Sequence, residues 1–467
     1  MNDTITKPLP ERELRGATLC QTLHWLASGR IDPRGLSEAY SAAITRENPR
    51  LNAYVQLNSA VATEAEGSAE RRRRGVFGRL DGVPVSIKDN LDVSGLSTRC
   101  GMPAIPEAAS DDAHVVARLR HAGAVILGKT QVPEGSLQAT STNLHTGPAH
   151  NPWRHGYEAG GSSGGAAAAV AAGLCAVAIG SDSLGSIRIP ASYCGVYALK
   201  PTHGEISLRG MKPAARRLDC IGLIARNVDD LGILLHVLAG YDAHDSRSRQ
   251  RRVGLALPDW EPGKLRVGVL ADLAAFGTQP AVADVFSAAM AALCQELGQC
   301  SPVDFGDFPL QRARRAAFFL IEAEMLVTHA HALADADQPP SGEINRLLDF
   351  ARSRSAADYA LADRMLDGAT VTARELFAQI DVLVTPTTPQ AAFPLGTPLP
   401  DNQGDFTCFA NFSGCPAVSI PMGLTQDGLP VGMQFLGPPG SDLRLLELAE
   451  VCAAALDTAP AYPICQE

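Results

Sequence analysis

Two serine-containing loops and an upstream lysine hold the side chains of this sequence that could do chemistry together. The first loop, Gly160–Gly165, reads GGSSGG, and the second, Asp182–Pro190, reads DSLGSIRIP. Lys88 ends an alternating apolar segment upstream of both loops. A serine hydroxyl is a weak nucleophile that needs a base beside it, and a lysine acts as that base only in its neutral form. The loops and Lys88 together predict a hydrolase with a serine nucleophile that does without histidine.

An acyl-transfer site also needs donors aimed at the oxyanion that develops in the transition state. The second loop offers a run of backbone N–H groups for this role, from Ser183, Leu184, Gly185 and Ser186. No Gly-Lys-Ser/Thr follows the first loop, which disfavours a nucleotide-binding P-loop. Burial at the end of an apolar strand would lower the pKa of Lys88, as its role as a base requires.

The elements that must position these residues are short strands that alternate with helices. Residues 83–88 alternate as a half-buried strand, 113–122 read as an amphipathic helix, and 124–128 read as a buried strand. This order predicts an α/β architecture. Further helices are expected over about 12–75, 166–172, 281–297, 308–375 and 442–456, and further strands over 175–179, 265–270, 381–384, 417–420 and 431–435. The polar stretch 241–263 is expected to be a surface connection.

Composition narrows the class of protein. The chain has 467 residues, 46% of them apolar, and a formal net charge of −10. This charge disfavours a general nucleic-acid surface, which needs a basic footprint. The basic run Arg71–Arg74 is expected to be a solvated helix end rather than a binding patch.

Three features of the sequence indicate where the protein is located and whether it holds a cofactor. They are its cysteines, its histidines and its N-terminal segment. The eleven cysteines lack CxxC spacing, so they are expected to be buried free thiols in a reducing compartment, as at Cys175, Cys294 and Cys452. The first residues lack a signal-peptide core, and no apolar run is long enough to span a membrane. The histidines lack metal-site spacing. We therefore expect a cytoplasmic protein with no membrane association, no metal and no organic cofactor.

On these residues the chain resembles the amidase signature family. The resemblance extends over roughly residues 30–455 and is strongest over 82–202. Besides the two loops, its motifs are GVPVSIKDN at 82–90, NPW at 151–153, CGVYALKPT at 194–202, VTPTTP at 384–389 and GCPAVSIP at 414–421. It implies a single domain over 1–467, with a central mixed, twisted sheet flanked by helices on both faces.

The resemblance also implies a Ser–cis-Ser–Lys triad. Ser186 would be the nucleophile, and Ser162, preceded by a cis peptide bond from Gly161, would bridge it to the base Lys88. The two serines lie 24 positions apart, which is the usual interval in the family.

Three neighbours of the triad are expected to brace the two loops. They are Ser163 in the first loop and Asp182 and Arg188 in the second. Direct contact of these side chains with substrate is the alternative. Taken without the resemblance, the Asp182–Arg188 pair is a structural ion pair.

The sequence departs from the family at the oxyanion loop, where Leu184 replaces a glycine. If the position requires a positive φ, leucine would be strained there. Otherwise its isobutyl group shapes the acyl pocket. Two further residues are candidate substrate contacts: Asn143, for which capping a turn is the alternative, and Arg209, for which plain exposure is the alternative.

The expected function is cleavage of the C–N bond of a neutral small-molecule amide or carbamate (urethane) through an acyl-enzyme on Ser186, by a monomer or homodimer. An aryl acylamidase or a urethanase would fit. Three alternatives remain: a biuret-like urea-derivative hydrolase with a small partner subunit, the glutaminase subunit of a tRNA-dependent amidotransferase, and an inert binding scaffold. The glutaminase subunit usually has glutamine where Ile189 stands here. Labelling by a serine-directed fluorophosphonate would separate an enzyme from an inert scaffold.

Overall fold

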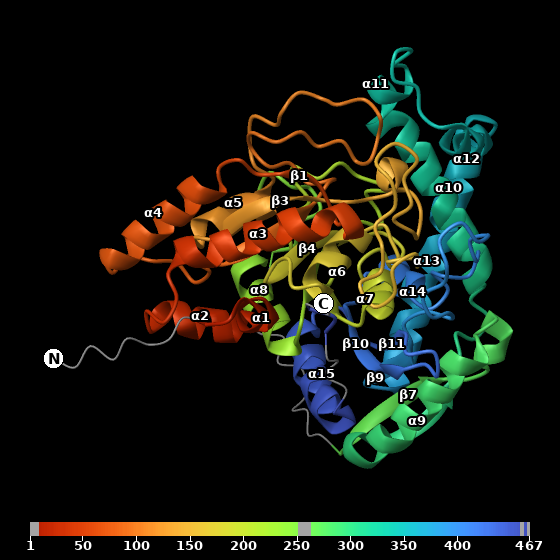
Figure 1. Cartoon of the computed structure of the whole chain (residues 1–467). Helices are drawn as coiled ribbons and strands as arrows, with labels where there is room; N and C mark the ends of the chain where they lie inside the picture. Colours follow the sequence, from red (N-terminus) through yellow and green to blue (C-terminus); the bar gives the residue numbers. More distant parts are fainter. Residues whose placement is uncertain (1–8, 251–262, 458–461, 465–467) are drawn as a thin grey trace.

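One mixed sheet runs through the structure, with strands drawn from Tyr54 to Leu436 (Figure 1). The computed structural model describes residues 9–250, 263–457 and 462–464. Within those residues the sheet has eleven strands in the order β1-β3-β2-β4-β6-β5-β10-β11-β9-β7-β8. The strands are β1 (Tyr54–Leu57), β2 (Pro84–Lys88), β3 (Val125–Thr130), β4 (Val177–Asp182), β5 (Tyr197–Lys200), β6 (Cys220–Ala225), β7 (Leu265–Leu270), β8 (Gly298–Val303), β9 (Val382–Pro386), β10 (Ala417–Leu424) and β11 (Pro430–Leu436).

The helices lie before, between and after these strands. They are α1 (Glu11–Gly16), α2 (Leu19–Ala27), α3 (Pro33–Leu51), α4 (Val61–Arg73), α5 (His114–His121), α6 (Gly164–Ala171), α7 (Arg188–Cys194), α8 (Val228–Leu238), α9 (Pro280–Leu297), α10 (Leu310–Thr328), α11 (Ala330–Leu333), α12 (Gly342–Arg352), α13 (Ala356–Gln379), α14 (Cys408–Ser413) and α15 (Asp442–Leu456). Two short 3₁₀ turns, η1 (Glu134–Ser136) and η2 (Leu273–Phe276), complete the regular structure of the described residues.

Helices cover both faces of the sheet. α6 and α7 pack together over the central strands β4, β5, β10 and β11, while α8, α9 and α15 pack against the other face. At one side α10, α12, α13 and α14 gather around a second apolar cluster (Figure 1). In the described part of the chain, no helix is both long and apolar enough to cross a membrane. The predicted α/β architecture, with a mixed sheet between helices, is confirmed.

The parallel pairing of β2 with β4 is the part of the sheet that matters most for the two loops. Val85 pairs with Val177 and Ile87 with Ile179. Parallel strands end at the same edge of a sheet, so this register brings Lys88, at the end of β2, to the same edge as Asp182, at the end of β4.

Several strands differ from the sequence prediction. The N-terminal region, expected to be helical, also contains β1, which pairs antiparallel with β3. β5 and β6 were not predicted, because buried apolar runs of a few residues have no periodicity that separates a strand from other buried segments. β8 was not predicted either, because its sequence, GQCSPV, is mostly polar and contains a proline. β4 begins two residues later than expected and continues to Asp182, because β6 pairs with it up to that residue. Of the expected surface connection 241–263, residues 251–262 lie outside the described residues.

The expectation that the cysteines are buried free thiols is wrong in part. Cys294 is bonded to Cys300, because the chain reverses between α9 and β8 and brings their Cα atoms to 6.0 Å. Cys20 is a free thiol but is exposed. The other cysteines of the described residues, Cys175 and Cys452 among them, are buried and free as expected.

Candidate active site

Lys88 ends β2 with its side chain fully buried. Its Nζ donates hydrogen bonds to Ser162 Oγ at 2.8 Å and to Ser181 Oγ at 3.0 Å. When the amine is neutral, the short distance to Ser162 also allows the serine hydroxyl to donate to Nζ. Lys88 and Ser162, predicted as the base and the bridging residue, are therefore brought into direct contact.

Burial lowers the pKa of Lys88 from 10.5 to about 7. The negative charge of Asp182 and groups at Cys100 and Asp219 oppose the shift, but the loss of solvation of the ammonium outweighs them. A substantial fraction of the amine is then neutral near pH 7. The site thus meets the condition that a lysine base requires.

The first loop meets the second through the backbone. Gly161–Ser162 is a cis peptide bond, as the resemblance implied, and α6 begins two residues after Ser162. Ser163 N–H donates to the carbonyl of Ser186 at 3.0 Å, and Ser163 Oγ donates to the carbonyl of Ser181 at 3.2 Å. Ser163 therefore ties the loop to both β4 and the Ser186 turn, which is the bracing position expected for it.

Ser186 lies between β4 and α7, on the wall of a cavity of about 300 Å³. It is partly exposed, whereas Ser162, which does not line the cavity, is 2% exposed. Ser183 and Leu184 line the same cavity. A molecule in the cavity would thus meet Ser186 first, with the buried serine and lysine on the protein side.

A buried ion pair supports the second loop. Arg188 donates to both carboxylate oxygens of Asp182, each at 3.0 Å, and also to Asn411 Oδ1 at 2.7 Å and Gln434 Oε1 at 3.0 Å. Burial raises the pKa of Asp182, but the charge and hydrogen bonds of Arg188 more than reverse this, so the pKa lies below its usual value. The bracing role expected for Asp182 and Arg188 agrees with these contacts.

The conformation of the second loop answers the question raised by Leu184. Among the described residues, those other than glycine with a positive φ do not include Leu184, whereas Gly185 has a φ of +121°. A Cβ on Gly185 would lie 2.1 Å from Thr407 Oγ1. The loop therefore requires glycine at 185 and accepts leucine at 184, whose side chain packs against the second apolar cluster.

One expected oxyanion donor is already engaged. Gly185 N–H donates to Asp182 Oδ1 at 2.7 Å, so the expectation for Gly185 needs correction. The aspartate is held against the start of α7 by Arg188 and takes this N–H as a turn cap does. Three of the expected backbone donors then remain, at Ser183, Leu184 and Ser186.

Asp219 was not assigned a role from the sequence. Ser183 Oγ donates to its Oδ1 at 2.5 Å, and the N–H groups of Ala214 and Ala215 donate to its Oδ2 at 3.0 and 3.2 Å. Burial raises the pKa of this carboxyl to about 7. Since Ser183 and Ala214 both line the cavity, Asp219 joins two of its walls. The sequence signal that could have pointed to Asp219 is an acidic residue next to an apolar run. Such a carboxyl becomes buried, and a buried carboxyl needs hydrogen-bond donors.

Ser181, Asn90, Asn411 and Gln434 also support the site and were missed. Asn90 Nδ2 donates to Ser181 Oγ at 2.9 Å, which fixes the hydroxyl that contacts Lys88. Asn411 and Gln434 reach Arg188 from α14 and β11, more than 200 residues along the chain. No local pattern could have paired residues so far apart in sequence.

The two candidate substrate contacts are used elsewhere. Asn143 donates to the carbonyls of Gly101 and Val132, and its Oδ1 accepts from two backbone N–H groups, so its alternative role in a turn holds. Arg209 donates to Asp242 at 2.9 Å and to His114 at 2.9 Å. Neither residue lines the cavity beside Ser186. Both assignments as substrate contacts are therefore corrected.

The cavity beside Ser186 is mainly apolar and has balanced charge. Its apolar lining includes Leu137, Leu184, Ile189, Phe318, Ile321 and Leu347, so α10 and α12 supply one wall. Arg314 is neutralised by an ion pair with Asp405. Arg315 lies over the ring of Phe350 at 5.0 Å. Among the described residues, no group of histidine, cysteine and acidic side chains could hold a metal ion.

We expect kcat/KM for a cleavable amide to rise with pH and to level off above an apparent pKa of about 7. Burial lowers the pKa of Lys88 from 10.5 to about 7, so the protonated form, which cannot accept a proton, dominates below that pH. Activity should fall about tenfold for each pH unit on the acid side. Initial rates at low substrate concentration over the acid and neutral range measure this profile.

Asp219 also has a pKa raised to about 7, so the control must separate the two groups. Asp219→Asn should keep the acid limb, and Lys212→Met, which changes a half-exposed lysine, should leave the profile unchanged. A limb that disappears in Asp219→Asn would contradict the assignment to Lys88.

Two neighbouring substitutions should differ in size and in the kinetic constant that they change. Gly185→Ala places a Cβ in contact with Thr407 and at a φ of +121°, so kcat/KM should fall by about 10²-fold or more as the Ser186 turn shifts. Leu184→Ala should fold normally and raise KM for apolar substrates by about tenfold. Steady-state kinetics with thermal unfolding of both variants tests this pair, and equal effects on kcat would count against it.

Comparison with known proteins finds similarity to amidases over most of the chain. The family model described as Amidase matches residues 36–446. A glutamyl-tRNA(Gln) amidotransferase subunit from Deinococcus radiodurans is 35% identical, over 92% of this chain and 96% of that protein. The corresponding subunit from Archaeoglobus fulgidus is 33% identical, over 90% and 96%.

The chain is also similar in fold to solved structures. A structure described as an unexpected vestigial protein complex that reveals the evolutionary origins of an s-triazine catabolic enzyme is 31% identical, with a TM-score of 0.87, and covers 96% of this chain and 100% of that one. A 6-aminohexanoate cyclic dimer hydrolase complexed with substrate is 29% identical, with a TM-score of 0.85, covering 97% and 99%. By sequence, fold and the arrangement of the two serine loops, the chain belongs to the amidase signature family.

Proposed function

We propose that the protein is a serine amidohydrolase that cleaves the C–N bond of a neutral amide or carbamate through an acyl-enzyme on Ser186. One observation carries the proposal. Lys88 is fully buried with a pKa of about 7 and contacts Ser162, while Ser186 of the adjoining loop opens to an apolar cavity. This is the arrangement that an uncharged base, a relay hydroxyl and an accessible nucleophile require.

The first step is attack on the substrate carbonyl. Neutral Lys88 takes the proton of Ser162, which takes that of Ser186, as the Ser186 oxygen bonds to the carbonyl carbon. The carbonyl oxygen becomes an anion, and the free N–H groups of the Ser183–Ser186 turn are the candidate donors to it. Asp219 and Asp182 hold this turn through Ser183 and Gly185.

Release of the amine follows when the proton returns through Ser162 to the leaving nitrogen and the C–N bond breaks. Water, activated by the same relay, then attacks the acyl-enzyme and frees Ser186. Each transfer moves one proton along the same path, so Lys88 ends the cycle neutral. The lowered pKa of Lys88 suits this shuttling, because neither state of the amine is strongly favoured near neutral pH.

The substrate class is argued from the cavity. Most of its lining is apolar, and Arg314 is already paired with Asp405. Arg315, which lies over the ring of Phe350, and Asp401 also line the cavity, so the preference for an uncharged substrate rests on the larger apolar share of the lining. An uncharged substrate with an alkyl or aryl group beside its carbonyl fits the cavity better.

Two other functions have specific support. The amidotransferase relatives favour a glutaminase role, although Ile189, which lines the cavity here, stands where glutaminase subunits usually have glutamine. The solved complex related to an s-triazine catabolic enzyme favours a urea-derivative hydrolase that works with a partner protein. Both would use the same Lys88–Ser162–Ser186 chemistry on a smaller, more polar substrate.

Hydrolysis of a matched substrate set tests the proposal. The set is a nitroanilide, a nitrophenyl ester and an aryl carbamate with apolar groups, together with L-glutamine and biuret. We expect cleavage of the amide or carbamate by the wild-type protein, little cleavage of L-glutamine or biuret, and a loss of at least about 10³-fold in Ser186→Ala. Release of nitroaniline, nitrophenol or ammonia is measured.

Ser94→Ala changes an exposed serine and should behave as the wild-type protein does. Preferred hydrolysis of L-glutamine or of biuret would transfer the assignment to the corresponding alternative. A folded wild-type protein that cleaves none of these substrates, and whose Ser186 resists a fluorophosphonate, would be an inert scaffold.

A further inference from the structure

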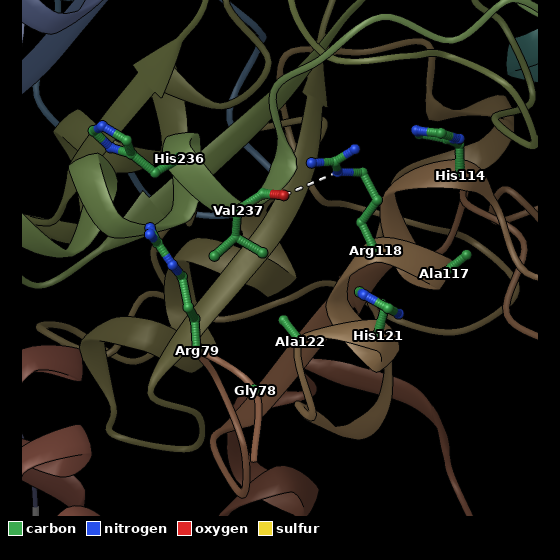
Figure 2. A pocket seen from close by; sticks show the side chains of 9 residues that line it. All are labelled: Gly78, Arg79, His114, Ala117, Arg118, His121, Ala122, His236 and Val237. Atoms are coloured by element: carbon green, nitrogen blue, oxygen red, sulfur yellow. Dashed lines mark hydrogen bonds between the residues drawn. The ribbon is translucent and has the colours of Figure 1, made fainter. Parts of the chain in front are cut away.

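A second cavity, of about 650 Å³, opens between α5 and α8 and shares no lining residue with the cavity beside Ser186. Figure 2 shows Arg79 extending from the turn before β2 toward His236 on α8, while Arg118 on α5 extends toward the carbonyl of Val237 and His121 lies beside Ala122. His114 and His236 also line the space. It belongs to no part of the proposed reaction.

The lining of this cavity is basic, whereas the chain as a whole has a net negative charge. Two arginines and three histidines line it, and none of the described residues in its lining is acidic. The whole sequence has 50 acidic and 40 basic residues. A concave site with one sign of charge raises the local concentration of ions of the opposite sign.

Helix ends account for part of this charge. Arg118 and His121 lie in the last turn of α5 and His236 in the last turn of α8, where cations complement the helix dipole. Arg118 Nε donates to the carbonyl of Val237 at 2.9 Å, which leaves its two terminal nitrogens for another acceptor (Figure 2). Arg79 lies outside any helix, so a dipole does not explain it. Within the described part of the chain, neither Arg79 nor His121 has a hydrogen-bond or ion-pair partner.

His114 lines the cavity but is held by a neighbouring pair of charged residues. Its Nδ1 lies 2.9 Å from Arg209 Nη2 and 3.1 Å from Asp242 Oδ2, so this nitrogen can accept from the arginine in one tautomer and donate to the carboxylate in the other. Its Nε2 is buried, so a molecule in the cavity does not reach it. The candidate ligands of an anion are therefore the other cationic side chains of the lining.

We propose that the cavity between α5 and α8 binds the phosphate group of a small molecule, held by the guanidinium groups of Arg79 and Arg118 and by the ring of His121. Guanidinium groups match phosphate oxygens through paired N–H donors. The volume leaves room for more than the phosphate itself. The proposal does not depend on the function assigned to Ser186.

Titration calorimetry with inorganic pyrophosphate tests the proposal on the full chain. Arg79→Gln/His121→Gln removes two exposed side chains that make no polar contacts within the described residues, so the fold should be retained. We expect the wild-type protein to bind pyrophosphate and the double variant to bind about tenfold more weakly or worse. Arg374→Gln, at an exposed arginine of α13, is the matched control and should bind as the wild-type protein does.

Arg118→Gln is a second variant in which the same loss is expected, with thermal unfolding to check its fold. Citrate at equal concentration separates phosphate recognition from general attraction of anions. Pyrophosphate binding that is absent, that is unchanged in the double variant, or that citrate matches would overturn the proposal.

Discussion

The burial of one amine, Lys88 Nζ, is the constraint on which the rest of the site depends. An ammonium taken out of water loses much of its solvation, so the folded protein holds this lysine with a pKa of about 7 instead of 10.5. The amine then needs hydroxyl partners that tolerate both of its states, and Ser162 and Ser181 are such partners. The parallel register of β2 with β4, and Asn90 behind Ser181, keep those hydroxyls in place.

A second buried group, the Asp182 carboxylate, stabilises the neighbouring turn, but it keeps its charge, whereas a substantial fraction of Lys88 is neutral. Asp182 remains ionised because Arg188 donates to both its oxygens, and Asn411 and Gln434 each accept one further guanidinium N–H. Removing one partner of such a pair would leave a buried charge uncompensated, at a cost of about 3–5 kcal/mol. The position of Ser186 thus depends on residues from β4, α14 and β11, which are adjacent only in the folded sheet.

The sequence was sufficient to predict the residues and elements that a local pattern identifies. The two glycine-rich loops, Lys88 at the end of a strand, and the helices over 281–297 and 442–456 could all be recognised from neighbouring residues. It was insufficient where tertiary contacts decide. Asn143 donates to the carbonyl of Gly101, and Arg209 lies beside His114, and these contacts join segments that are far apart in the sequence.

Two of the strands that were missed, β5 and β6, also depend on contacts between distant segments. β5 and β6 are short and wholly buried, so they lack the alternation that identifies a strand with one solvated face. Asp219 stands just before β6, and its importance emerges only when Ser183 and the 214–215 segment converge on it. In each case the information lies in a pairing between distant segments.

The most direct test of the central claim is the rate at which a fluorophosphonate labels Ser186, followed by mass spectrometry, in the wild-type protein and in Lys88→Met. If a neutral buried lysine activates Ser186 through Ser162, the wild-type protein labels at Ser186 and the variant labels about 10²–10⁴-fold more slowly while remaining folded. Equal labelling rates, or labelling of the wild-type protein at another serine, would contradict the account.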